Sequence, residues 1–200
     1  MRTSTPERHA KDGLPIIAFS SDDAWETWLT EHHVEQPGVW LKLAKKGSGV
    51  PTVTYPEAVA TALCFGWIDS QAGSYDSAWW MQRFTPRGPR SVWSQVNRST
   101  VGALAEAGRM RPAGAAAVEK AKSDGRWDRA YAPQRTATVP DDLRTALDAD
   151  PAAAAAFETL NMANRYAILY RVQDAKRPET RARRIASFVQ MLARGDTLYP

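Results

Sequence analysis

The chain has 200 residues, with 26 basic and 22 acidic side chains, a formal charge of +4 and 44% hydrophobic residues. This length suffices for one good core, or for a domain with a smaller helical companion. No stretch is long and apolar enough to cross a bilayer, so membrane insertion is not expected. One cysteine cannot form an internal disulfide, and the polar start of the chain lacks a secretory signal, so a cytoplasmic protein is expected.

The first part of the chain predicts a tail and then a helix. Residues 1–13 are polar and are expected to form a disordered tail. A helix is expected over residues 20–33, because Trp25, Trp28 and Leu29 fall on one helical face. Ser21 or Asp22 is the expected N-cap.

The next part predicts a small sheet. Apolar and polar residues alternate after Gly38, which is typical of a strand. A helix follows from Thr54 or Tyr55 to Gly66, a suitable C-terminal glycine. Residues 67–86 then predict two strands around a turn near residues 72–76.

Helices are expected in the rest of the chain. One is predicted from Ser91, which is its candidate cap, and another ends near residues 124–125. The predicted fold class is therefore α+β: a small, mostly antiparallel three-stranded sheet packed with helices over residues 14–127. A linker is expected at residues 128–138 and a helical C-terminal module at residues 139–200.

Several long segments resemble the YdeI/OmpD-associated protein family. They include "GVWLKLAKKGSG", "TVTYPEAVATALCFGWIDSQ" and "QRFTPRGPRSVWSQVNR". The closing segment, from "VPDDLRTALDADPAAAAAFETL" onward, is similar to the bacteriocin-protection (OmdA-type) module of that family. The resemblance implies a link to stress resistance against cationic antimicrobial peptides and to an outer-membrane porin, but no catalytic residues. A basic protein is a poor direct trap for a cationic peptide, so any such role is expected to be indirect.

Polar side chains among aromatic residues form the main candidate binding site. They are Lys45, Lys46, Trp67, Asp69, Arg83, Arg87, Trp93 and Arg98. Cationic side chains beside an aromatic wall suit a small anionic or aromatic ligand, or a peptide. The alternative is structural: Asp69 pairs with Arg83 or Arg87 across a hairpin, while the tryptophans fill the core.

An enzyme is a second hypothesis for the same residues. Asp69 would be the acid or base, Lys46 or Arg83 would stabilise charge, and Cys64 or Tyr55 would assist. Cys64 is more simply a small buried residue, because no histidine is placed by its spacing to activate it. The spacing of cysteine and histidine predicts no metal site, and no phosphate-binding loop is present, so no cofactor is expected.

Basic residues are concentrated at the C-terminal end. Residues 163–200 carry eight basic and three acidic side chains. An exposed helix face laced with ion pairs is the favoured interpretation. Nucleic-acid binding is a third hypothesis, not favoured, because the segment lacks a recognised reading motif.

Overall fold

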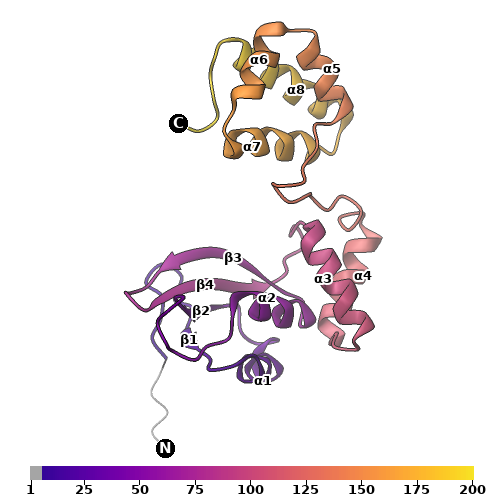
Figure 1. Ribbon diagram of the computed structural model, residues 1–200. Coiled ribbons are helices and arrows are strands. Elements are labelled where there is room, and N and C mark those ends of the chain that lie inside the picture. The colour runs from indigo at the N-terminus through magenta and orange to yellow at the C-terminus, as the bar shows by residue number, and fades with distance from the viewer. Residues whose placement is uncertain (1–5) are drawn as a thin grey trace, which may run out of the picture. The chain divides into compact units, whose positions relative to one another are not determined.

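The structure, a computed structural model, describes residues 6–200 and divides into two compact units. The first unit runs up to Val92 and includes Asn97–Asp128, and the second comprises Trp93–Val96 and Arg129–Pro200. The described residues form four strands and eight helices, which confirms the α+β class. Figure 1 shows how these elements are arranged within each unit. Residues 1–5 of the predicted tail lie outside the described residues.

The sheet of the first unit has four strands in the order β1-β2-β4-β3. They are β1 (Ile16–Ala18), β2 (Val39–Ala44), β3 (Trp67–Ser74) and β4 (Trp79–Pro86). β4 pairs antiparallel with β2 and β3, whereas β1 pairs parallel with β2. The prediction of three strands is therefore wrong. β1 has only three residues, too few to display the alternation by which a strand is identified.

The two faces of the sheet have different coverings. Alternation along β4 places Trp80, Gln82 and Phe84 on one face and Met81 and Arg83 on the other. We call the first of these the helix face, because helices α1 (Asp22–His32) and α2 (Tyr55–Cys64) pack on it (Figure 1). These two helices and the sheet enclose the core of the first unit.

Tryptophan joins both helices to the helix face. The Trp25 ring of α1 lies 5.6 Å from the Phe84 ring, centroid to centroid. Its indole Nε1 donates a hydrogen bond of 3.1 Å to the Ala58 carbonyl oxygen of α2. A fully buried indole thus has its polar atom satisfied.

The helix ends follow the sequence signals closely. The Ser21 hydroxyl caps α1 by accepting from the Ala24 amide at 3.3 Å. Thr54 caps α2 and forms a reciprocal capping box with Glu57. Gly66 follows the end of α2 with a φ of +73°, a conformation that favours glycine.

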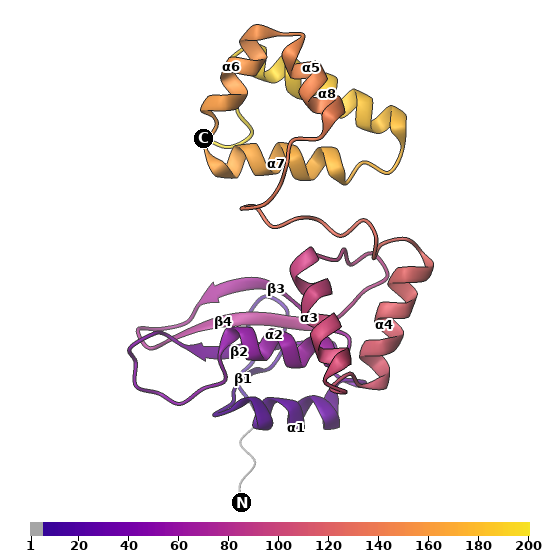
Figure 2. The same ribbon diagram turned by 45° about the vertical axis from the view of Figure 1, so that its right-hand side comes forward.

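Two further helices, α3 (Gln95–Glu106) and α4 (Pro112–Ser123), lie side by side (Figure 2). α3 begins four residues after Ser91, so the predicted cap is wrong; the Ser91 hydroxyl instead accepts a hydrogen bond from the Gly88 amide. α4 approaches the end of α2 at Gly114, where a Cβ atom would lie 2.1 Å from the Cys64 carbonyl oxygen. Only glycine permits this approach.

The face of the sheet opposite the helices is covered by the N-terminal segment. The Asp12 carboxylate accepts hydrogen bonds from the Trp40 indole (3.1 Å) and the Arg83 guanidinium (2.9 Å). The His9 ring stacks on Trp40 with a centroid separation of 4.2 Å. The expectation of a disordered tail is therefore wrong for residues 6–13. Its composition is polar, but its polar groups have partners in the sheet.

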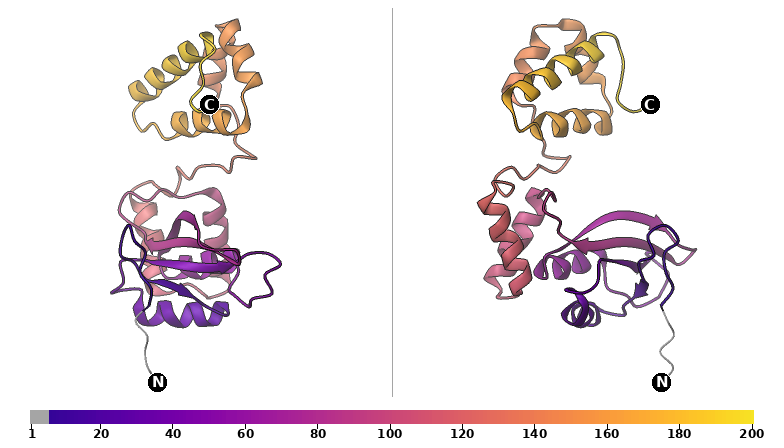
Figure 3. Two further views of the ribbon diagram at one scale, coloured as in Figure 1. Left: turned by 90° about the vertical axis from the view of Figure 1, so that its left-hand side faces the viewer. Right: turned by 180° about the vertical axis from the view of Figure 1, so that it is seen from behind.

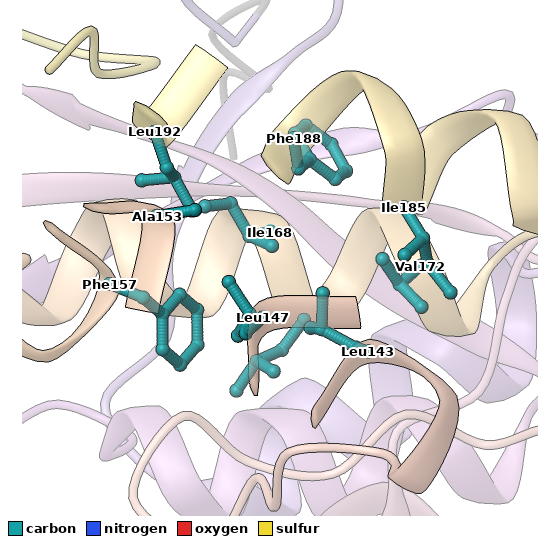
Figure 4. Close-up of a cluster of buried hydrophobic side chains, with 10 residues drawn as sticks. Leu143, Leu147, Ala153, Phe157, Ile168, Val172, Ile185, Phe188 and Leu192 are labelled. Carbon is teal, nitrogen blue, oxygen red and sulfur yellow. The ribbon is translucent and has the colours of Figure 1, made fainter. Parts of the chain in front are cut away.

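The second unit contains α5 (Asp141–Asp148), α6 (Pro151–Thr159), α7 (Met162–Gln173) and α8 (Pro178–Ala193). Helix α8 packs against the other three, as the two views of Figure 3 show. Figure 4 shows how their apolar side chains meet in one core. The buried members are Leu143, Leu147, Ala153, Phe157, Ile168, Leu169, Val172, Ile185, Phe188 and Leu192.

The segment predicted as a linker, residues 128–138, is partly held within the second unit. The Tyr131 amide donates to the Trp93 carbonyl oxygen at 3.0 Å, and its ring lies 5.4 Å from the Tyr170 ring. The Tyr166 hydroxyl donates to the Ala132 carbonyl oxygen at 3.0 Å. These contacts fix the middle of the segment against α7.

The end of the chain is clamped by a buried asparagine. The Asn164 side-chain oxygen accepts hydrogen bonds of 2.9 Å from the Leu198 and Tyr199 amides, and its Nδ2 donates to the Tyr199 carbonyl oxygen at 3.0 Å. Asn164 is 2% exposed, and the hydrogen bonds offset the cost of burying its amide.

Candidate functional site

The most distinctive polar contact of the sheet joins Tyr55 and Asp69. Tyr55 is the first residue of α2, immediately after the Thr54 cap. Asp69 stands opposite Phe84 in the β3–β4 register, which places it on the helix face. The Tyr55 hydroxyl donates a hydrogen bond of 2.7 Å to Asp69 Oδ2. The first turn of a helix and a strand thus bring a phenol and a carboxylate together.

Trp80 and Gln82 of β4 share this face with the pair. The Trp80 ring lies 5.8 Å from the Tyr55 ring, centroid to centroid. Gln82 is 4% exposed, yet none of the side-chain hydrogen bonds found among residues 6–200 involves its amide. We call Tyr55, Asp69, Trp80 and Gln82 the Tyr55–Asp69 site.

The backbone next to the site is irregular. The β3–β4 register shifts between Asp69 and Ala72. Such bulges bend a strand and re-aim its side chains, and they are common near functional sites. The intervening Ser70 hydroxyl donates to the Arg83 carbonyl oxygen at 3.4 Å, a weak bond across the irregularity.

The charge of Asp69 is not matched by an ion pair within the part of the chain that the structure describes. Among residues 6–200 no ion pair involves its carboxylate. Arg83 projects from the opposite face of the sheet and pairs with Asp12 at 2.9 Å. Arg87 donates through its amide to the Gly66 carbonyl oxygen and through Nη1 to the Val92 carbonyl oxygen. One half of the structural alternative, in which Asp69 pairs with Arg83 or Arg87, is therefore wrong, because the observed partner of Asp69 is Tyr55. The other half, in which the tryptophans fill the core, agrees with the burial of Trp67 and Trp93.

The predicted tryptophans are interior residues. Trp67 and Trp93 are each 1% exposed. The Trp67 indole donates to the His33 carbonyl oxygen at 3.2 Å, and its ring meets Trp28 edge-on at 6.0 Å. Neither indole offers an open ring face. The sequence predicts them as site residues because polar residues flank them. Flanking polar residues are found beside both cleft and core tryptophans, so this signal does not separate the two cases.

The other basic residues of the predicted site, Lys45, Lys46 and Arg98, have no described contact with Asp69. Lys45 is exposed, and its ammonium donates to the Asp76 carbonyl oxygen at 2.7 Å; Lys46 is also exposed. The Arg98 guanidinium lies 5.2 Å from the centre of the Trp127 ring. Of all the predicted site residues, only Tyr55 and Asp69 are joined to each other by a described hydrogen bond.

Trp80 and Gln82 were missing from the predicted site set. The alternation of β4 is the signal that could have found them, because it places both on the face that carries Phe84. Using that signal requires knowing which face α2 covers, and this is a tertiary fact.

Cys64 has the environment of a packing residue. It is 2% exposed, and burial raises the pKa of its thiol, although the positive field of Arg109 opposes the shift. A raised pKa suppresses the thiolate that nucleophilic chemistry needs. The polar groups nearest to it are already paired: Arg109 contacts Asp22 at 3.4 Å, and Arg111 contacts Glu26 at 2.6 Å. These pairs tie α1 to the segment before α4.

Two kinds of feature are absent from the described part of the chain. No group of three or more histidine, cysteine, aspartate or glutamate residues within residues 6–200 could hold a metal ion. No helix there combines the length and apolar character needed to cross a membrane.

The C-terminal arginines make internal contacts. Arg181 forms a two-pronged pair with Asp142, at 2.5 and 2.8 Å, and its hydrogen bonds hold the pKa of that carboxyl below its usual value. Arg184 lies 3.5 Å from Asp174. These pairs join α8 to α5 and to Asp174, the residue that caps the end of α7.

Comparison with known protein families gives two matches. Residues 17–117, about half of the chain, match a family described as a domain of unknown function (DUF8412). Residues 136–195 match the family described as Bacteriocin-protection, YdeI or OmpD-Associated (OmdA), which confirms the predicted resemblance for the C-terminal part. No curated protein and no solved structure matches the chain.

Proposed function

This chain belongs to the family described as a domain of unknown function (DUF8412) and carries an OmdA segment at its C-terminal end, and from that premise we propose that it is a ligand-binding protein. Its ligand is a small molecule, or the side chain of a peptide, held at the Tyr55–Asp69 site of the first unit. The OmdA description supports placing this binding in the response to antimicrobial peptides.

The observation that carries the proposal is the bonding of Asp69. Its carboxylate is half-buried on the helix face, and its described hydrogen-bond partner is the neutral Tyr55 hydroxyl. An ionised carboxylate has about four acceptor positions, and water occupies those that the protein leaves open at a partly exposed site. One donor leaves most of that capacity for a ligand.

Two neighbours add to this argument. The half-buried Trp80 ring provides a flat apolar surface, and the side-chain amide of Gln82, a residue that is 4% exposed, has no described hydrogen bond. Few polar groups beside an apolar wall are typical of small-molecule sites. A purely structural tyrosine–aspartate pair would need neither neighbour.

The proposal is tested with the full chain purified under native conditions. Native mass spectrometry is expected to detect a non-covalently bound small molecule, and the Asp69→Asn variant is expected to lose it. Tyr75→Phe is the matched control, because it deletes a hydroxyl that donates to Glu7 and leaves the helix face untouched. Retention of the same molecule by Asp69→Asn, or loss of it from the control alone, contradicts the proposal.

A further inference from the structure

Resting on the proposed function, we infer that the ligand presents an organic cation to the Tyr55–Asp69 site, as an ammonium, amidinium or guanidinium group with N–H donors. The sequence predicts a small anionic or aromatic ligand, or a peptide, and the cationic group differs from the anionic member of that set. The difference arises because the fold separates the basic side chains from Asp69.

Charge is the first reason. The described residues of the first unit carry fourteen basic and fourteen acidic side chains. Within residues 6–200 Asp69 has no ion-pair partner, whereas Arg83, the nearest basic residue along the pairing strand, is neutralised by Asp12 on the other face. A cationic ligand would supply the counter-charge that residues 6–200 do not supply. An anionic ligand would meet the uncompensated carboxylate.

Hydrogen-bond chemistry is the second reason. An ionised carboxylate only accepts hydrogen bonds. The Tyr55 hydroxyl donates its proton to Asp69 Oδ2, so toward a ligand it could act only as an acceptor. The Gln82 amide oxygen is a third acceptor on the same face. Three acceptors match a group with several N–H donors, and charge-assisted bonds of this kind are the strong ones.

The aromatic rings are the third reason, because a similar tyrosine–tryptophan pair elsewhere in the sheet already holds a cation. On the opposite face, the Lys42 ammonium lies 3.9 Å from the centre of the Tyr75 ring and 5.0 Å from that of Trp79. Tyr55 and Trp80 repeat this tyrosine–tryptophan pairing on the helix face. No described cation of residues 6–200 lies over the Trp80 ring. Aromatic faces attract cations, and more strongly when water is partly excluded.

The inference is tested with three probes of one shape: benzamidine, which is cationic, benzamide, which is neutral, and benzoate, which is anionic. Each is titrated into the ¹⁵N-labelled full chain at constant ionic strength, and the Trp80 indole N–H signal is followed by NMR. Benzamidine is expected to shift this signal with an affinity about tenfold or more above that of either relative, the size expected for one charge-assisted contact. Asp69→Asn should remove the preference, and Tyr75→Phe should preserve it.

The outcomes separate this inference from the proposed function. Equal or tighter binding of benzoate or benzamide at Trp80 overturns the cationic class and leaves the ligand site standing. A benzamidine preference that survives Asp69→Asn also overturns it, because the carboxylate is then not its source. If no probe moves the Trp80 signal, the molecule found by native mass spectrometry decides between the outcomes. A molecule without a basic nitrogen overturns the inference. The absence of any bound molecule overturns the proposed function as well.

Discussion

The Tyr55 hydroxyl and the Asp69 carboxylate stand 2.7 Å apart, fourteen positions from each other in the chain. They come from the start of α2 and the start of β3, two elements joined by a turn at Gly66. The contact therefore depends on how α2 packs against the sheet, and it reports on that packing as well as on the site.

The hydrogen bond should contribute modestly to stability. We expect Tyr55→Phe to lower the free energy of unfolding by about 0.5–1 kcal/mol, because Tyr55 is 39% exposed and water competes for the bond. Urea unfolding at pH 7 measures this. In the double variant with Asp69→Asn, the two losses should be less than additive. Strict additivity would mean that the two groups do not interact in solution.

Low pH should weaken the packing of the N-terminal segment on the face of the sheet that lies opposite α1 and α2. Burial opposes ionisation of Asp12, but hydrogen bonds from Arg83, Trp40, the Leu14 amide and His9 outweigh it and lower the pKa of Asp12 to about 2, from 3.8. A lowered folded-state pKa gives stability that is fully present above the unfolded-state value and is lost as pH falls through the folded-state value. The loss is therefore expected between about pH 4 and pH 2.

Asp12→Asn tests this dependence. The variant should be less stable than the parent near neutral pH by about 1 kcal/mol. The difference should shrink as the pH falls from 4 to 2, because the parent then loses what the variant already lacks. Urea unfolding at several pH values measures it, with Asp23→Asn, an exposed site on α1, as the charge-matched control. A difference that stays constant with pH would show that Asp12 ionisation does not support the fold.

Two helical glycines should respond to alanine in opposite directions. At Gly114 a Cβ would lie 2.1 Å from the Cys64 carbonyl oxygen, a backbone atom that cannot swing aside. We expect Gly114→Ala to destabilise the chain by several kcal/mol, on the order of 3, because α4 must move off α2.

Gly102 of α3 is the matched position. A Cβ atom added at Gly102 would have no other atom within 4 Å. Gly102→Ala should therefore stabilise the chain by about 0.5–1 kcal/mol through helix propensity alone. Thermal unfolding of the two variants separates them. A neutral Gly114→Ala would mean that α4 does not approach α2 as closely as the structure shows.

The Cys64 thiol should be slow to react in the folded chain. It is 2% exposed, and burial raises the pKa of its thiol. We expect the disulfide reagent DTNB to label it at least a hundredfold more slowly at pH 7 than in 6 M urea, since only rare opening exposes it. Fast labelling of Cys64 without denaturant, at a rate that no longer rises with pH above a value below pH 7, would instead indicate a reactive thiolate and would support the enzyme hypothesis.

The sequence by itself determined the local elements. Ser21, Thr54 and Gly66 set helix ends through hydrogen bonds and backbone angles within a few residues, so their roles are readable along the chain. Strand alternation likewise located β2, and the long motifs identified the OmdA family of the C-terminal part.

Only the tertiary structure decided which polar groups meet. Asp69 and Arg83 are close in the β3–β4 hairpin, yet alternation turns their side chains to opposite faces, where Tyr55 and Asp12 bind them. The polar residues that follow Trp67 in the sequence suggest a cleft residue, but helix packing buries its side chain. The physical reason is the range of the interactions. Caps and periodicity act over one or two turns of chain. Ion pairing, burial and the N-terminal cover depend on contacts between residues up to 87 positions apart, which no local pattern encodes.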